Sequence, residues 1–335
     1  MNKLRYLIRR IREMDFKNMI AQAKIVRRRT RKPIIFILVD MIWCGFKYLA
    51  GYMDYVVFEF YNLNSKQRKT QVTRGINNQL VKKLNNKDSW YKFDKKDEFN
   101  RIFAQFLGRD WLDLEKADEN QLQEFFMKHP MAIVKPRDGA CGKGVEKISV
   151  NDFESVQKLR EICISNGQTV AEEIIVQNSK MDELFPKCVN TVRMVTITYN
   201  GKVNVVFCSI RIGAGDTIVD NLNSGGMAAL VDAETGVIIT DAADKNGDVF
   251  THHPDTKTKI CGFEIPFFKE GREAVEKAAL IVPEIGYVGW DIAFTENGVL
   301  LIEGNHFPGH DIYQMPALTK DGIGVLPRFE EAMRG

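Results

Sequence analysis

The chain has 335 residues, of which 44% are hydrophobic and 27% are charged, with 25 Gly and 10 Pro. This composition excludes a disordered chain, a collagen-like repeat and a small disulfide scaffold. The formal net charge of +3 is unevenly spread, because residues 1–32 carry about +10 and the remainder about −7. A basic arm therefore precedes a mildly acidic body.

The six cysteines are scattered, without a CxxC pair or a histidine at metal-ligand spacing. This pattern favours reduced thiols in a reducing compartment. The apolar stretches Ile34–Val39 and Met41–Phe46 each end at a charged residue, and neither reaches the roughly 18 uncharged apolar residues of a spanning helix. The long basic region before them fits a signal peptide poorly. We therefore expect a cytoplasmic protein.

Residues 1–61 are expected to form a helical N-terminal region. Apolar residues recur at helical spacing with arginines between them, at Leu4, Leu7, Ile8, Ile11 and Met14. Such a basic amphipathic helix suits two settings equally: an anionic membrane surface contacted through residues 1–32, at the inner face of the cytoplasmic membrane, or the protein's own body. Nucleic acid fits less well, since no aromatic residues interleave the arginine cluster at 27–31. The aromatic segment 48–61 is expected to pack as helix, with its rings in a core.

Residues 62–125 are expected to form a helical connecting region. Their first part is polar and rich in charge. Phe99, Ile102, Phe103 and Phe106 then form a helical stripe that ends at Gly108, a typical helix stop. From about residue 126 the pattern changes to short apolar strands separated by glycine-rich turns.

The first chemical motif is an apolar strand that ends in Lys135 and is followed by a loop containing Gly139, Gly142 and Gly144. Glycines let backbone amides approach an anion, and a lysine at a strand end can meet a phosphate as a point charge. The loop is not a Walker A loop, because Lys143 is followed by glycine and not by Ser or Thr. By itself the motif is equally typical of a plain hairpin turn.

The second motif lies in residues 289–310, where a strand carrying Asp291 precedes a turn and an apolar strand that ends in Glu303 and Asn305. Glu303 and Asn305 are two residues apart and share a face, and a hairpin would bring Asp291 beside them. Three hard oxygen ligands are what Mg²⁺ shared with nucleotide phosphates requires. The alternative is a set of solvated charges at strand ends.

Together, and in this order, the two motifs resemble the ATP-grasp superfamily from about residue 95 to the end, with Thr169–Gln177 as the strand and hinge between them. The stretch TVRMVTITYNGKVNVVFCSIR and the loop NLNSGG look like those of the bacterial glutamate-adding ligases of that superfamily. The whole chain most resembles the sugar-transfer-associated ATP-grasp proteins of bacterial polysaccharide loci. The resemblance implies an α+β ATP-grasp core in residues 126–335, in which two subdomains, 126–188 for the nucleotide and 189–335 for metal and substrate, clamp ATP.

The resemblance also implies which residues bind the cofactors, ATP and Mg²⁺, with two ions expected. The residues that would contact the phosphates are Lys135, Gly142, Lys143 and Gly144. Those at the hinge that would contact adenine are Glu172, Glu173 and Ile175, while Gln177 could reach the ribose. The metal ligands would be Asp291, Glu303 and Asn305.

Arg193 and Arg211 match arginines that neutralise the transferring phosphoryl group or the substrate carboxylate, and Asn221 borders the acceptor site. Both arginines could instead be charged surface residues of a strand. An additional upstream phosphate ligand has two candidates, Lys96 and Arg101, and no acidic ribose ligand is evident after the hinge.

Four histidines need a separate interpretation. His306 and His310 follow the metal ligands and suit either acid–base chemistry or a structural role in a loop. His252 and His253 are adjacent and would face opposite sides of an extended chain, which favours loop residues over a metal pair.

The activity that the resemblance implies is ATP-dependent ligation of a carboxylate to an amine through an acyl phosphate. The partners would be an amino acid and a sugar acid or amino sugar of a surface polysaccharide, such as a capsule, or of its precursor. Two alternatives remain open: a kinase of a glycan precursor, and a non-catalytic membrane-associated adaptor in polysaccharide synthesis.

Overall fold

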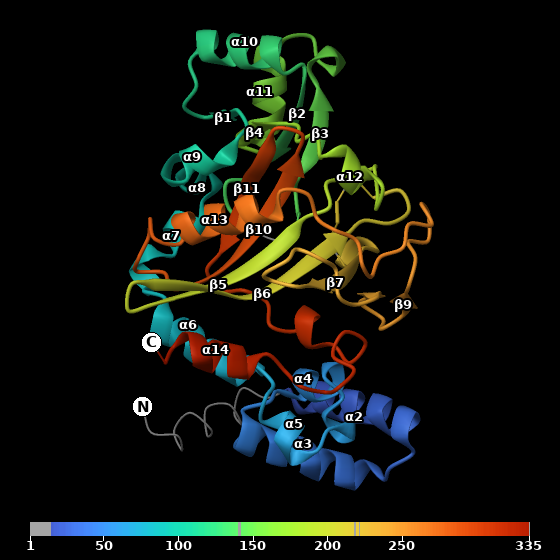
Figure 1. The fold of residues 1–335 in the computed structure, drawn as a ribbon. Coiled ribbons are helices and arrows are strands. Elements are labelled where there is room, and N and C mark those ends of the chain that lie inside the picture. The colour runs from blue at the N-terminus through green and yellow to red at the C-terminus, as the bar shows by residue number, and fades with distance from the viewer. Residues whose placement is uncertain (1–14, 140–141, 218, 221, 335) are drawn as a thin grey trace. The chain divides into compact units, whose positions relative to one another are not determined.

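The computed structural model describes residues 15–139, 142–217, 219–220 and 222–334 (Figure 1). The helix expected at residues 4–14 lies outside the described residues. The chain divides into two compact units, one made of Met1–Lys83 with Gly309–Glu331 and the other of Leu84–Pro308 with Ala332–Gly335. Each unit has its own buried core and is described separately below.

The first unit is helical. Its elements are α2 (Phe16–Thr30), α3 (Ile34–Tyr48), α4 (Tyr52–Val57), η1 (Phe60–Asn62), α5 (Ser65–Arg68), α6 (Arg74–Leu84), η5 (Ile312–Gln314) and α14 (Leu326–Ala332). Asp15 caps α2 by accepting a hydrogen bond from the backbone amide of Asn18. In the part of the chain that is described, no helix has the length and apolar content that crossing a bilayer requires.

Aromatic side chains form much of the core of this first unit. Tyr55, Phe58 and Phe60 are at most 2% exposed and pack with Tyr48 and Met41, which confirms the expectation that these rings belong to a core. The segment between residues 309 and 331 is tied in by a buried contact. His310 Nε2 lies 3.0 Å from Asp54 Oδ1, and its ring packs against Phe58. His310 therefore has a structural position in the first unit.

The second unit contains a small antiparallel sheet with the strand order β1-β4-β2-β3 (Figure 1). Its strands are β1 (Trp111–Asp113), β2 (Met131–Lys135), β3 (Glu146–Ser149) and β4 (Val170–Glu173). Helices α10 (Glu119–Lys128) and α11 (Val156–Ser165) pack on it through Leu122, Phe126 and Leu159. Strand β1 comes from the region that the sequence analysis assigned to the connecting segment 62–125.

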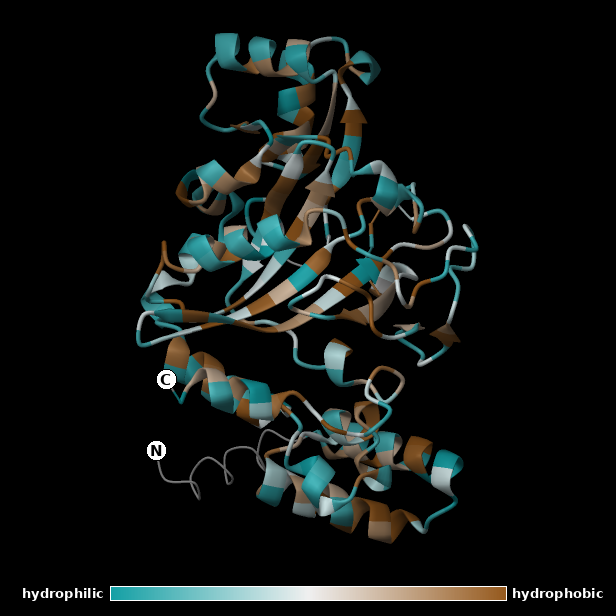
Figure 2. Ribbon diagram, in the orientation of Figure 1, coloured by the Kyte–Doolittle hydropathy of each residue, from teal (hydrophilic) through white to brown (hydrophobic). Residues whose placement is uncertain are grey.

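The large sheet of the second unit has the order β11-β10-β5-β6-β7-β8-β9. Its strands are β5 (Val192–Tyr199), β6 (Lys202–Ile212), β7 (Met227–Val231), β8 (Ala242–Asp244), β9 (Val249–Phe250), β10 (Tyr287–Thr295) and β11 (Gly298–Asn305). Strand β10 is buried from Tyr287 to Phe294; Figure 2 shows that hydrophobic segments alternate with paler and hydrophilic ones along the strands of this sheet. Asp291 is the one charged residue of this buried stretch.

Helices cover the large sheet and join the two sheets. The remaining elements are η2 (Lys87–Ser89), α7 (Tyr91–Asp94), α8 (Lys96–Ile102), α9 (Ala104–Leu107), η3 (Val150–Asp152), α12 (Ser179–Asp182), η4 (Leu222–Ser224) and α13 (Phe268–Ala278). The predicted stripe ending at Gly108 corresponds to α8 and α9. Gly108 takes a left-handed conformation with φ of 56°, as a helix stop requires.

Gly304 brings α7 and α8 close to the end of β11. A Cβ atom at this position would lie 2.8 Å from the ring of Phe93 and 3.0 Å from that of Phe99. Both rings are buried, so Gly304→Ala should destabilise the second unit by about 1–3 kcal/mol through overpacking. Urea unfolding checks this. The double variant Gly304→Ala/Phe93→Leu should recover part of the loss, and no recovery would contradict a steric cause.

Candidate active site

Asp291 and Glu303 face each other across the hairpin of β10 and β11. They are partners in the antiparallel register, with an irregularity just after Asp291, so the predicted hairpin is confirmed. Asp291 is 1% exposed. Asn305 lies two residues beyond Glu303 on the same strand, and its Oδ1 accepts a hydrogen bond of 2.8 Å from the backbone amide of Phe307. Two carboxyl groups and an amide oxygen therefore gather at one end of the large sheet.

Two arginines from the neighbouring strands hold Asp291 in place. Arg193, on β5, pairs with Asp291 in the strand register and binds both carboxylate oxygens. Arg211, on β6, places Nη2 at 2.8 Å from Asp291 Oδ2 and also donates to Thr191 Oγ1. Both guanidinium groups are about 15% exposed or less. The surface-residue alternative for Arg193 and Arg211 is therefore wrong.

The two carboxyl groups have opposite electrostatic settings. Burial works against ionisation of Asp291, but the charges of Arg193 and Arg211 hold its pKa well below the ordinary range. Burial raises the pKa of Glu303, and the neighbouring charge of Asp291 raises it further. Asp291 is buried and Glu303 is half-buried beside it; two adjacent carboxylates repel each other, and a divalent cation relieves that repulsion. The oxygen donor set and this electrostatic setting together fit Mg²⁺.

A cavity of about 410 Å³ opens beside this hairpin, between the two sheets of the second unit. The large sheet lines it with Glu303, Asn305 and the following His306, and the small sheet lines it with Lys135. Cavities of this size are typical of sites for small molecules and cofactors. A lysine and hard oxygen ligands thus face the same space.

Lys135 is held by a buried ion-pair network. Its Nζ lies 2.7 Å from Glu172 Oε2, which also receives Arg109 Nε at 3.1 Å, while Asn100 donates to Glu172 Oε1 at 2.9 Å. Burial lowers the pKa of Lys135, against the opposing charge of Glu172. Burial works to raise the pKa of Glu172, but Arg109 and Lys135 hold it well below its ordinary range. Glu172 is therefore a partner of basic side chains, as the alternative interpretation had it, but it is buried and not exposed.

Arg109 connects the small sheet to the strand that carries Glu303. Besides contacting Glu172, it donates through Nη1 to the carbonyl of Leu301 at 2.6 Å and through Nη2 to that of Ile302 at 3.2 Å. The sequence analysis missed Arg109 and Asn100, because neither belongs to a local motif. For Arg109, the only indication in the sequence is its position directly after the predicted helix stop at Gly108.

The match to a family model decides what this arrangement is. Residues 75–330 match the model described as sugar-transfer-associated ATP-grasp. The chain belongs to that family. The predicted ATP-grasp fold is thereby confirmed.

Solved ATP-grasp ligases are similar to this chain at low identity. The ATP-grasp ligase PsnB complexed with its minimal precursor has 12% identity and a TM-score of 0.42, over 74% of this chain and 61% of its own. The D-alanyl-alanine synthetase A of Vibrio cholerae has 13% identity and a TM-score of 0.43, over 72% of this chain and 64% of its own. The D-alanine–D-alanine ligase of Bacillus anthracis has 13% identity and a TM-score of 0.42, over 84% of this chain and 82% of its own. The comparison with curated proteins found no match.

The glycine loop of this ATP-grasp protein approaches the cavity beside Lys96. Lys96 Nζ donates to the carbonyl of Gly139 at 3.0 Å, and both residues line the cavity. Arg101 instead pairs with Asp97 and Glu98. Gly142 and Gly144 have φ near +70°, and a Cβ on Gly144 would lie 2.8 Å from the Pro136 ring. Lys143 is exposed between them.

Gln177, which follows β4, has a structural environment. Its amide donates to Asp182 Oδ1 at 2.7 Å and to the carbonyl of Phe185 at 2.8 Å, and its Oε1 accepts from Asn190. The buried side chain is thus occupied within the large-sheet region, which speaks against contact with a ribose. Ile175 lies in the irregular segment after β4 and is half-buried.

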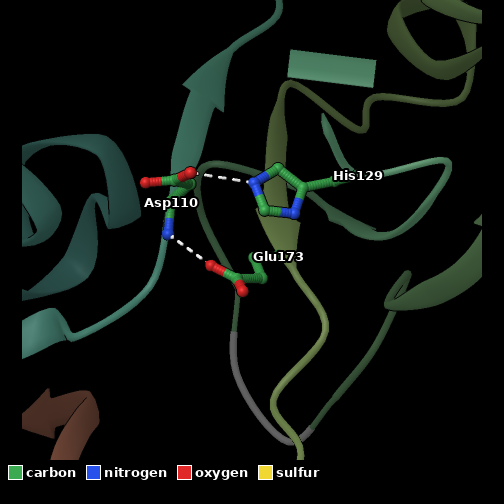
Figure 3. Close-up of side chains that lie close together, drawn as sticks. All are labelled: Asp110, His129 and Glu173. Carbon is green, nitrogen blue, oxygen red and sulfur yellow. Dashed lines mark hydrogen bonds and ion pairs between the residues drawn. The ribbon is translucent and has the colours of Figure 1, made fainter. Parts of the chain in front are cut away.

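Glu173, the last residue of β4, belongs to a cluster with Asp110 and His129 (Figure 3). Its Oε2 accepts from the backbone amide of Asp110 at 3.0 Å, and His129 Nε2 lies 2.8 Å from Asp110 Oδ2. The three side chains are close enough to share a metal ion, but Lys128 already pairs with Asp110. We interpret the cluster as a structural contact that links the end of α10 to the end of β4.

Of the remaining predicted residues, some line the cavity and others make structural contacts away from it. His306 lines the cavity, with Nε2 at 2.8 Å from Asp94 Oδ1 and its ring stacked on Trp90. His253 is buried and bonds the carbonyl of Gly213, whereas His252 is exposed, so the two adjacent rings have the opposite settings that their sequence spacing predicts. Asn221 lies outside the described residues.

Proposed function

We propose that the chain is an ATP- and Mg²⁺-dependent carboxylate–amine ligase that converts ATP to ADP and phosphate. One observation carries the proposal: Lys135 from one sheet, and Glu303 and Asn305 from the other, line a single cavity. The family description supports a sugar substrate. We therefore infer that the product is an amide between an amino acid and a sugar component of a bacterial surface polysaccharide or its precursor.

Asp291, Glu303 and Asn305 are the residues that would hold magnesium, and two ions are expected. Bound magnesium would neutralise the charge of the phosphates. Arg193 and Arg211 occupy three of the acceptor positions of Asp291, whereas a carboxylate has about four. Glu303 and Asn305 are thus the main protein ligands in this proposal.

The cations of the chain would bind and orient the phosphates. The ion pair with Glu172 fixes the position of the Lys135 ammonium group, and a hydrogen bond to the Gly139 carbonyl holds Lys96 beside the glycine loop. Arg193 and Arg211 are locked by Asp291, so they need no reorganisation when charge develops beside them. Positioning and electrostatics of this kind supply most of the catalysis of phosphoryl transfer.

The proposed reaction has two bond-forming steps. A carboxylate oxygen of the substrate attacks the γ-phosphorus of ATP, and the bond from that phosphorus to ADP breaks. The amine nitrogen then attacks the acyl carbon, phosphate leaves, and the nitrogen loses a proton. Water would hydrolyse the acyl phosphate, so the loop that carries Lys143 is expected to close over the site before the first step.

Lys96→Met should raise the KM for ATP by about tenfold or more, because a charge-assisted hydrogen bond contributes about 1.5–3 kcal/mol. Arg101→Met is the matched control, since Arg101 lies on the same helix but pairs with Asp97 and Glu98. Its KM should change less than twofold. Steady-state ADP release measures both values, and equal effects of the two changes would remove Lys96 from the phosphate site.

An ADP-release screen tests the reaction. Amino acids are combined with nucleotide-linked and lipid-linked uronic acids, and products are identified by mass spectrometry. An amide with free phosphate supports the ligase. A stable phosphorylated acceptor would show a kinase instead. ATP binding without ADP release, unchanged in Glu303→Ala, would show a non-catalytic adaptor.

The proposed setting is the cytoplasm, with residues 1–32 near an anionic membrane and not on nucleic acid. The described part of that arm ends in exposed basic side chains at Arg27, Arg28 and Arg31. A ligase that acts on a lipid-linked precursor would meet its substrate at such a surface.

A further inference from the structure

Helix α3 is apolar on both of its sides. One side is buried in the core of the first unit through Ile37, Met41, Cys44 and Tyr48. The other side exposes six large apolar side chains, each between 45% and 68% accessible: Ile35, Phe36, Val39, Ile42, Trp43 and Phe46. A helix that is hydrophobic all round is normally covered on all sides.

The six side chains form one stripe along the helix. Their positions recur at steps of three, four and seven residues, which places them on a single face. Exposed apolar residues scattered singly are ordinary on a protein surface, but a contiguous set marks a surface that contacts another body. We call these six residues the α3 stripe.

No acidic side chain interrupts the α3 stripe. The single acidic residue of the helix, Asp40, points to another side, where it binds the guanidinium group of Arg68 through both oxygens and accepts a hydrogen bond from Tyr55. Its charge is thereby compensated inside the first unit. The stripe can enter an apolar medium without carrying an unpaired charge with it.

Basic side chains bracket the α3 stripe. Before it, the end of α2 and the connecting turn expose Arg27, Arg28, Arg31 and Lys32. After it comes Lys47, whose ammonium lies 5.3 Å from the Trp43 ring. Residues 15–48 contain eight basic and two acidic residues. The apolar face thus has a strongly positive border.

We propose that α3 lies in the plane of an anionic lipid bilayer, with the α3 stripe among the acyl chains and the basic border at the headgroups. A helix of 15 residues is about 22 Å long, shorter than the roughly 30 Å apolar core of a bilayer. An apolar face with an interfacial tryptophan and a lysine- and arginine-rich border is typical of helices that bind at the interface.

A second copy of the chain is a less suitable occupant. Pairing two α3 stripes would bring positive borders together at both ends, whether the helices run parallel or antiparallel, and like charges across an interface oppose association. Phosphate headgroups complement the same border. The membrane surface rests on the first unit alone and is independent of the proposed reaction.

Vesicle flotation of the full chain tests the proposal. Wild type should bind vesicles of phosphatidylcholine with phosphatidylglycerol far better than vesicles of phosphatidylcholine alone. Phe36→Gln/Trp43→Gln should weaken binding at least about tenfold. Met127→Gln/Leu280→Gln removes two apolar side chains that are 79% and 52% exposed in the second unit, and it should bind like wild type. Ile35→Gln/Val39→Gln repeats the test if the first pair misfolds by circular dichroism.

The basic border has its own test. Arg27→Gln/Arg28→Gln should weaken binding roughly thirtyfold at low ionic strength, from about 1 kcal/mol per basic residue near the surface. The loss should shrink as salt is added. The control Lys202→Gln/Lys269→Gln removes two exposed lysines of the second unit and should have no effect.

Insertion is distinguished from adsorption by quenching with lipids brominated along the acyl chain. Tryptophan emission should be quenched in wild type and not in Trp43→Phe. Three results would overturn the proposal: binding unchanged by the α3 stripe variants, equal binding to neutral and anionic vesicles, or a wild-type dimer that Trp43→Gln converts to monomer without any vesicle binding. ADP release with soluble substrates should be normal in the α3 stripe variants, so their failure is separable from failure of the ligase.

Discussion

Glu303→Gln should lower ADP release by roughly 10²–10³-fold, the usual effect of removing one electrostatic group from a reaction centre. Glu303 lines the cavity and lies opposite Asp291 in the hairpin. Glutamine keeps the size of the side chain but removes the negative charge that the proposed metal site needs. The thermal stability should hold or rise, because a neutral side chain at this half-buried position no longer opposes the charge of Asp291.

The control for this change is Glu264→Gln, which removes an exposed carboxylate of the second unit and should retain wild-type turnover. ADP release is measured over a magnesium titration for both. Wild-type turnover in Glu303→Gln would refute its assignment as a ligand. Asp291→Asn is a less clean test, because it also leaves Arg193 and Arg211 undercompensated in a buried site and should destabilise the fold.

The hairpin of the site could be predicted from sequence because its signal is local. Residues on a strand alternate between faces, so Glu303 and Asn305 share one, and the short turn before β11 returns the chain beside Asp291. The family resemblance then attached a chemical role to each position. Local alternation and a short turn suffice here, because Asp291 and Glu303 belong to consecutive strands of one hairpin.

The partners of these residues could not be predicted, because they meet over long separations. Arg109 is 63 residues from Glu172 and 192 from Leu301, and Arg193 is 98 residues from Asp291. No periodicity encodes such contacts; only the pairing of the strands creates them. The three-residue strand β1 escaped prediction for the same reason, since its partner β4 lies far along the chain.

The α3 stripe shows a different limit. The sequence displays the apolar residues of 34–46, but both sides of this helix carry large apolar residues, so the sequence does not say which side is buried. Only the packing of α2 and α4 against Ile37, Met41 and Cys44 leaves the other side exposed. The exposed side of such an apolar helix can therefore be identified only from the structure.

Glu172→Gln should destabilise the second unit by about 3–5 kcal/mol, the effect expected when one partner of a buried ion pair is removed. Glu172 compensates Lys135 and Arg109, whose side chains are 10% and 1% exposed. Urea unfolding measures the change. Trp90, Trp111 and Trp290 all lie in the second unit, so tryptophan fluorescence in a Trp43→Phe background reports on that unit alone.

The neighbouring Glu173→Gln is the matched control, because Glu173 accepts a hydrogen bond from a backbone amide, which glutamine can also accept, and the loss should stay under about 1 kcal/mol. The pH dependence separates charge from packing. Because the folded protein lowers the pKa of Glu172, its stabilising effect is complete above the unfolded value of about 4.3 and fades as the pH falls below it. The difference between wild type and Glu172→Gln should therefore be constant from neutral pH to about pH 5.5 and narrow below about pH 4.3. A difference that persists unchanged in acid would assign the loss to packing, and would remove the buried charge network as the element that holds Lys135 at the site.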